Sequence, residues 1–224
     1  MKHFSTIIFF VLFSAFNNIS AQNDSIISSN SIEKESNQKL NLKEVDSINH
    51  ITKDSNLSIG MPYQGGIIFY ILQPNDNGYI ENETHGLIAS TIDQSKRITW
   101  WNGKYISCGT EITGKAPTEI GYGCGKANTN SIIQSQGNNG SYAAKICRDY
   151  QGGGYSDWYL PNDIELLKMF DEKTTLQLND GFYWSSQETT SEEVICVGII
   201  DKVTVNAYND YKHNTYHIRA IRAF

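Results

Sequence analysis

Short runs of apolar residues at the start of the globular region predict β-strands. The run at 65–72 (GGIIFYIL) is typical of a buried strand, and the turn residues 74–78 close it. Residues 85–92 (HGLIASTI) predict a second strand, and the two runs together predict a hairpin. Residues 98–105 carry two tryptophans and predict a third, shorter strand.

Helical spacing of apolar residues replaces this pattern in the middle of the chain. Residues 127–136 and 141–150 predict two helices, separated by a Gly-Asn-Asn-Gly break. Further on, Asn162 lies three residues before Glu165, which is the spacing of a capping box. This signal predicts a helix over 163–172.

Strand-like runs return in the last third of the chain. They occupy residues 182–186, 194–200, 202–208 and 217–224. The order of strands, then helices, then strands predicts an α+β fold. We expect antiparallel strands, two or three short helices and long glycine-rich loops.

A charged residue interrupts the apolar face of the last run. Alternation places Arg222 on the same face as Ile218 and Ala220. A guanidinium among apolar side chains needs a carboxylate partner, because an unpaired buried charge is costly. We expect Asp157 or Glu165 to supply it.

The N-terminal part has a different composition. Residues 1–21 combine a charged start with a short apolar run, which is typical of a secretory signal peptide; an uncleaved membrane anchor is the alternative. Residues 22–59 are polar and predict a flexible linker, and residues 60–224 form the domain. The linker triplets Asp24-Ser25-Ile26 and Asp46-Ser47-Ile48 resemble a bacterial O-glycosylation sequon.

Export and charge limit the possible partners. No later segment is apolar enough to span a bilayer, so we expect no integral membrane protein but an exported one, located in the periplasm, on the cell surface or outside the cell. The chain has a formal net charge of −6, and the domain by itself is also acidic. An acidic domain lacks the positive surface that nucleic acid requires, so we expect no nucleic-acid partner.

The four cysteines are candidates for disulfides, because an exported protein reaches an oxidising compartment. Four cysteines allow three pairings, and the sequence alone does not choose among them. The pairing that we favour joins Cys108 to Cys124 across a glycine-rich loop, and Cys147 to Cys196 between a helix and a strand. The cysteines are too widely spaced for a zinc site, and we expect no metal.

Eight fragments resemble a known family in order and spacing. They include AAKIC, DWYLPNDIEL, YWSS and RAIRAF, and they extend over residues 61–224. On these fragments the sequence resembles the family of the C-terminal domain of the Legionella collagen-like protein (Lcl), found in exported bacterial proteins. The resemblance implies a C-type-lectin-like fold and an adhesin-like role. The signature residues that it implies are Asp157, Trp158, Pro161, Glu165, Trp184, Arg219 and Arg222.

Aromatic residues in and beside loops are the candidate ligand contacts. Flat aromatic side chains bury a large area and can stack on sugar rings or on peptide partners. On this ground we predict Trp100, Trp101, Tyr105 and Tyr122 as ligand-binding residues. The tryptophans of the family signature are expected in the core.

No catalytic pattern accompanies these aromatics. Ser185 and Ser186 lie near no recognisable base, and the five histidines form neither a nucleophile–base pair nor a metal-ligand pattern. We therefore expect no enzyme, no catalytic residue and no cofactor. The sequence favours an exported binding module for carbohydrate or another cell-surface ligand. The alternative is a structural or assembly domain of the cell envelope that contacts another protein.

Overall fold

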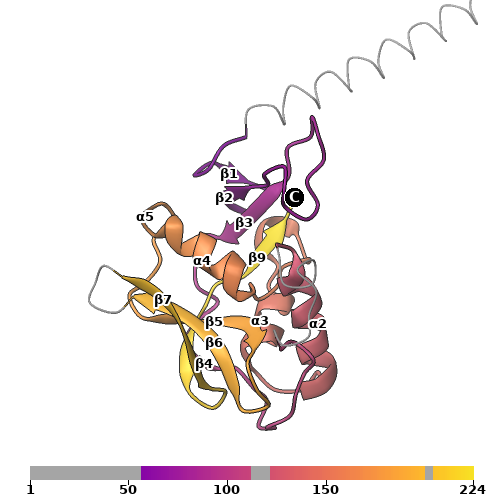
Figure 1. The fold of residues 1–224 in the computed structure, drawn as a ribbon, viewed down its shortest axis with the longest axis vertical. Coiled ribbons are helices and arrows are strands. Elements are labelled where there is room, and N and C mark those ends of the chain that lie inside the picture. Colours follow the sequence, from indigo (N-terminus) through magenta and orange to yellow (C-terminus); the bar gives the residue numbers. More distant parts are fainter. Residues whose placement is uncertain (1–56, 112–121, 200–203) are drawn as a thin grey trace, which may run out of the picture. The chain divides into compact units, whose positions relative to one another are not determined.

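The computed structural model describes residues 57–111, 122–199 and 204–224, and its elements follow the predicted order of strands, helices and strands (Figure 1). The α+β fold class predicted from the sequence is therefore confirmed. The elements, in chain order, are β1 (Pro62–Tyr63), β2 (Gly66–Ile71), β3 (Gly86–Ser90), β4 (Ser95–Thr99), α2 (Cys124–Gln136), α3 (Ala143–Asp149), the single 3-10 turn η2 (Gly152–Gly154), α4 (Asp163–Asp171), α5 (Lys173–Leu176), β5 (Phe182–Glu188), β6 (Glu193–Ile199), β7 (Val205–Tyr211), β8 (Thr215–Ile218) and β9 (Ile221–Ala223).

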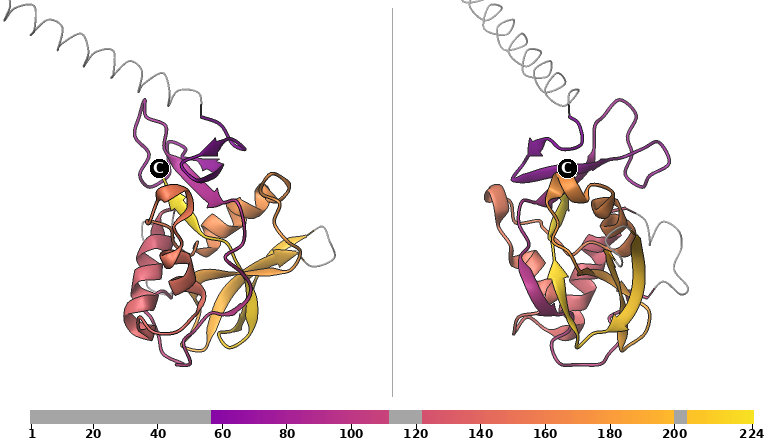
Figure 2. Two further views of the ribbon diagram at one scale, coloured as in Figure 1. Left: turned by 180° about the vertical axis from the view of Figure 1, so that it is seen from behind. Right: turned by 90° about the vertical axis from the view of Figure 1, so that its left-hand side faces the viewer.

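The strands form two sheets, with the orders β1-β2-β3-β9 and β4-β8-β5-β6-β7. Neighbours are antiparallel, except that β5 and β8 are parallel through the pair Tyr183 and His217. The hairpin predicted at the start of the domain is β2 paired with β3. Figure 2 shows the same chain from two further sides, with the last strand lying beside the first hairpin.

Two antiparallel chain segments form a ribbon that runs from one sheet into the other. In the first sheet β3 pairs with β9, and in the second β4 pairs with β8. The pairing is interrupted between the two sheets. The prediction of one strand over 217–224 is wrong at this point, because Arg219 and Ala220 separate β8 from β9. The Arg219 guanidinium donates to Asp93 (2.6 Å) and to the carbonyl of Ser90 (2.9 Å). These bonds fix both strands of the ribbon at the break.

The helices cover the sheets and close the core. α4 packs against β2, β5, β6 and β7, while α2 packs against β5 and α3. Trp158 and Trp184 are both at most 1% exposed, which confirms their predicted place in the core. Their indole nitrogens donate to the carbonyls of Gly152 (3.2 Å) and Ile98 (2.8 Å), so neither buried donor is left unpaired.

The capping box at the start of α4 is confirmed. The Asn162 side chain accepts from the Glu165 backbone N–H, and the Glu165 carboxylate accepts from the Asn162 backbone N–H, both at 2.8 Å. The glycines before it make a close backbone contact, because a Cβ on Gly153 would lie 2.3 Å from the Cα of Gly65. Gly153 also has a φ of 63°, which glycine adopts at little cost.

Two predicted strands are placed differently. The strand expected over 98–105 ends at Thr99, because Trp100 turns inward and its indole donates to the carbonyl of Ser185 (2.8 Å). The strand expected over 202–208 is β7, which lies further toward the C-terminus.

The predicted signal peptide, most of the linker and both sequon-like triplets lie outside the described residues. Leu57, near the start of the described chain, packs against the core, and the Gly60 N–H donates to the carbonyl of Ile68 (2.8 Å). None of the described helices is long and apolar enough to cross a membrane.

Candidate functional site

Two of the four predicted ligand-contact residues lie together at the surface. Trp101 and Tyr105 both belong to the loop that follows β4. Their ring centroids are 4.0 Å apart with an angle of 35° between the planes, and Tyr105 is 42% exposed. The loop therefore presents the Tyr105 ring to solvent, in contact with a half-buried Trp101 that packs against the core.

The turn between β7 and β8 adds two more rings to this pair. Tyr211 is 45% exposed and stacks on His213, with centroids 5.6 Å apart and an angle of 21°. Nδ1 of His213 shares a hydrogen bond with the hydroxyl of Tyr105. We call the four side chains of Trp101, Tyr105, Tyr211 and His213 the aromatic patch.

Trp100, the third predicted contact, is fully buried, so its assignment as a ligand-binding residue is wrong. The ammonium of Lys212 lies 4.8 Å from the centre of its ring. Its side chain points into the core while that of Trp101 stays half-buried, because β4 ends at Thr99 and the chain bends there. Trp100 thus belongs to the core cluster against which Trp101 packs.

Tyr122, the fourth predicted contact, belongs to a different part of the domain. Its ring stacks on Tyr70 of β2, with centroids 4.5 Å apart and an angle of 28°. It also lines a small pocket of about 310 Å³ together with Leu72, Leu87 and Phe224. The structure therefore does not bring Tyr122 into the aromatic patch.

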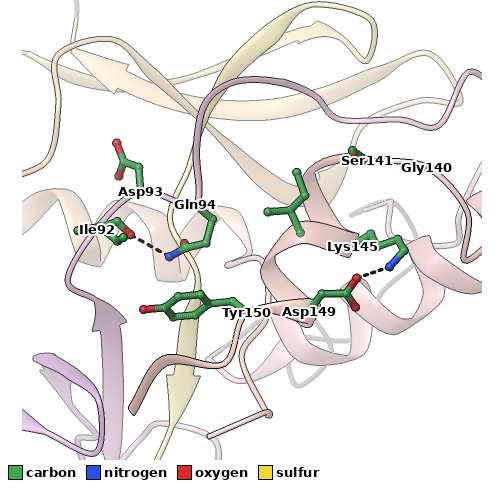
Figure 3. A pocket seen from close by; sticks show the side chains of 9 residues that line it. Ile92, Asp93, Gln94, Gly140, Ser141, Lys145, Asp149 and Tyr150 are labelled. Carbon is green, nitrogen blue, oxygen red and sulfur yellow. Dashed lines mark hydrogen bonds and ion pairs between the residues drawn. The ribbon is translucent and has the colours of Figure 1, made fainter. Parts of the chain in front are cut away.

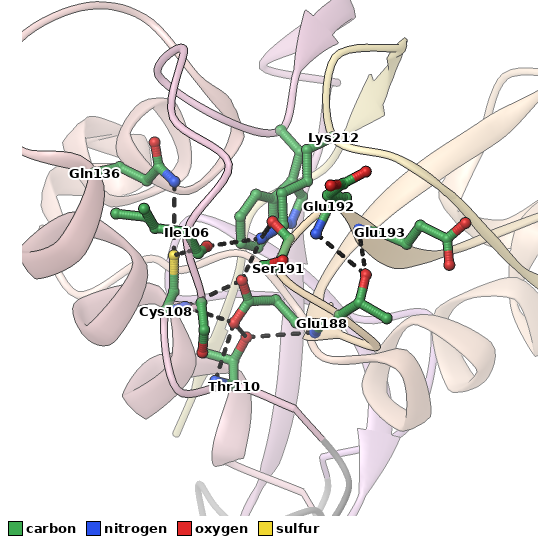
Figure 4. Close-up of polar contacts among 12 residues, drawn as sticks. Ile106, Cys108, Thr110, Gln136, Glu188, Ser191, Glu192, Glu193 and Lys212 are labelled. Atoms are coloured by element: carbon green, nitrogen blue, oxygen red, sulfur yellow. Dashed lines mark hydrogen bonds and ion pairs between the residues drawn. The ribbon is translucent and has the colours of Figure 1, made fainter.

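A buried ion pair joins two segments next to the aromatic patch, and Figure 4 shows the polar contacts around it. Glu188 at the end of β5 and Lys212 in the turn after β7 are both 0% exposed, with Oε1 and Nζ 2.5 Å apart. The Lys212 ammonium also donates to the carbonyls of Ile106 (3.0 Å) and Ser191 (2.6 Å). Lys212 therefore ties the loop that carries Tyr105 to Tyr211 at the end of β7 and to His213 in the turn that follows.

The Glu188 carboxylate holds the next part of the same loop. It accepts hydrogen bonds from the backbone N–H groups of Cys108 (2.9 Å) and Thr110 (3.1 Å) and from the Thr110 hydroxyl (2.8 Å). Such a full set of partners is what a buried carboxylate requires. The ion pair and its hydrogen bonds fix the loop from Ile106 to Thr110.

The first half of the loop is anchored to the end of α2. Gln136 is 1% exposed, and its side chain accepts from the Asn102 N–H and donates to the Lys104 carbonyl, both at 3.0 Å. The Asn102 amide in turn donates to the Gln136 carbonyl (3.1 Å). With both halves of the loop held, the patch is ordered before any ligand arrives, which lowers the entropy cost of binding.

The ion pair predicted for the last strand is present away from the patch. Arg222 donates to both carboxylate oxygens of Asp157, at 2.7 and 2.9 Å, so the first of the two expected partners is confirmed and Glu165 is not the partner. The hydrogen bonds from Arg222 hold the pKa of Asp157 below its usual range. The guanidinium also lies 4.0 Å from the centre of the Tyr155 ring.

Glu165 is fully buried, and it forms no ion pair with any of the residues that the structure describes. Besides its capping bond it accepts from the Gly123 N–H (2.7 Å) and the Tyr159 hydroxyl (3.2 Å). Burial raises the pKa of Glu165 to about 7, although these hydrogen bonds act in the opposite direction. The carboxylate packs so closely on α2 that a Cβ at Gly125 would lie 2.3 Å from Oε2.

The four cysteines are free and buried, so the predicted disulfides are not formed. Burial raises the pKa of Cys108 to about 11 and that of Cys196 to about 12, and it raises the pKa of Cys147 further. The reactive thiolate is therefore scarce at neutral pH. Each of these three side chains packs within the apolar core in place of a cross-link.

Among the described residues, no group of three or more His, Cys, Asp and Glu side chains is placed to hold a metal ion. What the patch itself offers is stacking area and hydrogen bonds from rings. This chemistry can bind a ligand that has an apolar face and polar edges.

Comparison with known proteins gives a distant structural likeness. No family model matches the sequence, and no curated protein matches it. One solved structure to which the chain is similar is a fimbrial protein from Bacteroides ovatus ATCC 8483, with 17% sequence identity and a TM-score of 0.47. The match covers 71% of this chain and 44% of that one, so the chain spans less than half the length of the fimbrial protein.

Proposed function

We propose that the protein is an exported, non-catalytic binding module that holds carbohydrate or another cell-surface ligand on the aromatic patch. The observation that carries the proposal is the touching pair of half-buried Trp101 and exposed Tyr105, on a loop that is anchored from both sides. A flat, ordered aromatic surface binds sugar rings with little loss of conformational entropy.

The family resemblance is part of the same proposal. We assign the domain to the Lcl C-terminal family, with a C-type-lectin-like fold. Support comes from the interactions that the signature residues make in this chain. Arg222 forms an ion pair with Asp157, and the Glu165 side chain completes the capping box at the start of α4. These interactions explain why the sequence needs the signature without giving it a catalytic role.

The experiment is a glycan array probed with the wild-type protein and with Trp101→Ala. We expect the substitution to weaken binding by about tenfold or more, because tryptophan contacts at the centre of a binding surface often contribute that much. Tyr79→Ala is the matched control, since Tyr79 is a partly exposed aromatic outside the patch. Equal binding by Trp101→Ala and wild type would remove the patch as the binding site.

The edge strand β7 favours a second candidate function, an envelope assembly domain that contacts another protein. β7 pairs with β6 along all seven residues, and no described strand pairs with its other edge. Such an edge can accept an extended segment of a partner as an additional strand.

Photo-crosslinking in the cell envelope separates this candidate from the first. A crosslinker at the exposed Asn209 of β7 is expected to capture a partner, and one at the exposed Asp171 of α4 is not. If Asn209 gives no product beyond that of Asp171, the assembly candidate is wrong, and glycan binding is unaffected by that result.

A further inference from the structure

A groove that shares no residue with the aromatic patch lies between α3 and the connection from β3 to β4. Its volume is about 480 Å³, and small-molecule sites span about 300–1,000 Å³. Figure 3 shows Ile92 and Gln94 on one side and Lys145 and Asp149 on the other, with Tyr150 between them. The groove is thus large enough for a ligand of one or two rings.

Apolar side chains give part of the groove a surface for a flat ligand. Ile92 is 62% exposed, and Ile146 and Tyr150 are partly exposed. The Tyr150 ring is held in place by an edge-to-face contact with Trp158, with centroids 5.2 Å apart. The apolar surface is therefore fixed.

The polar part of the groove is an ion pair with spare hydrogen-bonding capacity. Lys145 and Asp149 lie one helical turn apart on α3, and their side chains are 19% and 48% exposed. The Arg148 guanidinium also donates to Oδ1 of Asp149 (3.4 Å). An ammonium has three donors and a carboxylate about four acceptor positions, so these bonds still leave positions on Lys145 and Asp149 available. Ser141, just before α3, adds a hydroxyl to the lining.

The remaining polar groups are already satisfied. Asp93 is 2% exposed and bound by Arg219 at 2.6 Å. The Gln94 amide donates to the Ser90 hydroxyl (2.9 Å) and accepts from the Ala220 N–H (2.5 Å). The charged groups of the groove are therefore paired, with Asp149 bound by both Lys145 and Arg148.

We infer that this groove binds the neutral pyranose ring of a sugar. Two adjacent hydroxyls can accept from Lys145 and donate to Asp149 while the ion pair stays formed, because a hydroxyl is both donor and acceptor. The apolar face of the ring rests on Tyr150 and Ile92. A charged ligand would have to separate Lys145 from Asp149. An apolar ligand would displace water from these two side chains without replacing the hydrogen bonds that the water made.

The test is a titration of the purified, isotope-labelled protein with glucose, mannose, galactose and N-acetylglucosamine, followed by NMR shifts of the backbone amides. We expect at least one sugar to move the amides of residues 92–94 and 140–150 in a saturable way. Lys145→Met and Asp149→Asn should each weaken this binding by about tenfold, since each removes hydrogen bonds to a charged group. Lys173→Met is the matched control. Lys173 lies on α5, away from the groove, and forms a similar ion pair at the surface with Asp180.

Each other outcome overturns the inference. If no sugar moves these amides, or if Lys145→Met binds as well as Lys173→Met does, the groove is not a sugar site. If free amino acids move the amides and sugars do not, the ligand class is wrong. Trp101→Ala should leave binding in the groove unchanged, so a failure of the proposed aromatic patch is separable from a failure of this site.

Discussion

Two fully buried glutamates hold described residues on either side of the glycine-rich stretch 108–125, and they do so by different means. Glu188 binds Cys108 and Thr110 and faces the ammonium of Lys212. Glu165 binds Gly123 and is surrounded by neutral donors, so burial dominates and its pKa rises. Both carboxylates meet their hydrogen-bonding needs, but only one has its charge balanced.

This comparison explains why the domain needs no disulfide between Cys108 and Cys124. A cross-link there would hold the ends of the loop, and the two carboxylates already hold them through backbone N–H groups on either side. The anchor at Glu188 depends on the ion pair with Lys212, whereas the anchor at Glu165 depends on the protonation state of the Glu165 carboxyl. The predictions below test that difference, in order of decreasing effect.

Removing the cation should cause the largest loss. Lys212→Met leaves Glu188 buried without its counter-charge, and we expect the free energy of unfolding to fall by about 3–5 kcal/mol. Urea unfolding measures it. Lys173→Met, in an exposed pair, should cost less than about 1 kcal/mol. The double variant Glu188→Gln with Lys212→Met should recover part of the loss, and no recovery would argue against an uncompensated charge as the cause.

Glu165 should make stability depend on pH. Its carboxyl keeps a proton up to a pH of about 7 in the folded state, against an ordinary pKa of 4.5, so the folded state binds more protons between these values. Its contribution to the free energy of unfolding therefore falls as the pH rises through this window, by about 3 kcal/mol. Glu165→Gln should remove this component. Parallel pH profiles for the two proteins would show that Glu165 does not titrate there.

Two hydroxyl donors allow a matched test of the two anchors. Thr110→Val and Tyr159→Phe each remove one hydrogen bond to a buried carboxylate, and each should cost about 1–2 kcal/mol. Tyr159→Phe should also move the pH dependence of stability upward, because the Tyr159 hydroxyl lowers the pKa of Glu165. Thr110→Val should leave that dependence in place. The same pH response in both variants would remove the distinction between the anchors.

Reducing agent should have the smallest effect. With four free thiols, dithiothreitol is expected to leave the thermal unfolding midpoint unchanged, whereas a disulfide typically contributes about 2–4 kcal/mol. A fall in the midpoint on reduction would show that a disulfide forms in the protein.

Local patterns in the sequence predicted the elements of the fold well. The capping box of Asn162 and Glu165, the first hairpin and the core position of Trp158 depend on residues close in sequence or on apolar burial, and all three are present. The pairing of Arg222 with Asp157 was also accessible, because a buried guanidinium has few possible partners.

The tertiary structure alone decided where the aromatic residues point and what lies beneath them. Trp100 and Trp101 look alike in the sequence, yet one is in the core and the other in the patch, because β4 ends at Thr99 and the chain turns there. Tyr211 and His213 join Trp101 only through the folding of β7 and β8.

The sequence by itself determined the α+β class, the first hairpin, the helices and much of the core, because periodicity, caps and turns act over a few residues. Only the tertiary structure decided the buried pair of Glu188 and Lys212, the loop anchors and the free cysteines. Lysine is almost never fully buried, so no local signal marks Lys212 as the residue that ties the two segments of the aromatic patch together. Its role depends on strands distant in sequence that meet in the sheet.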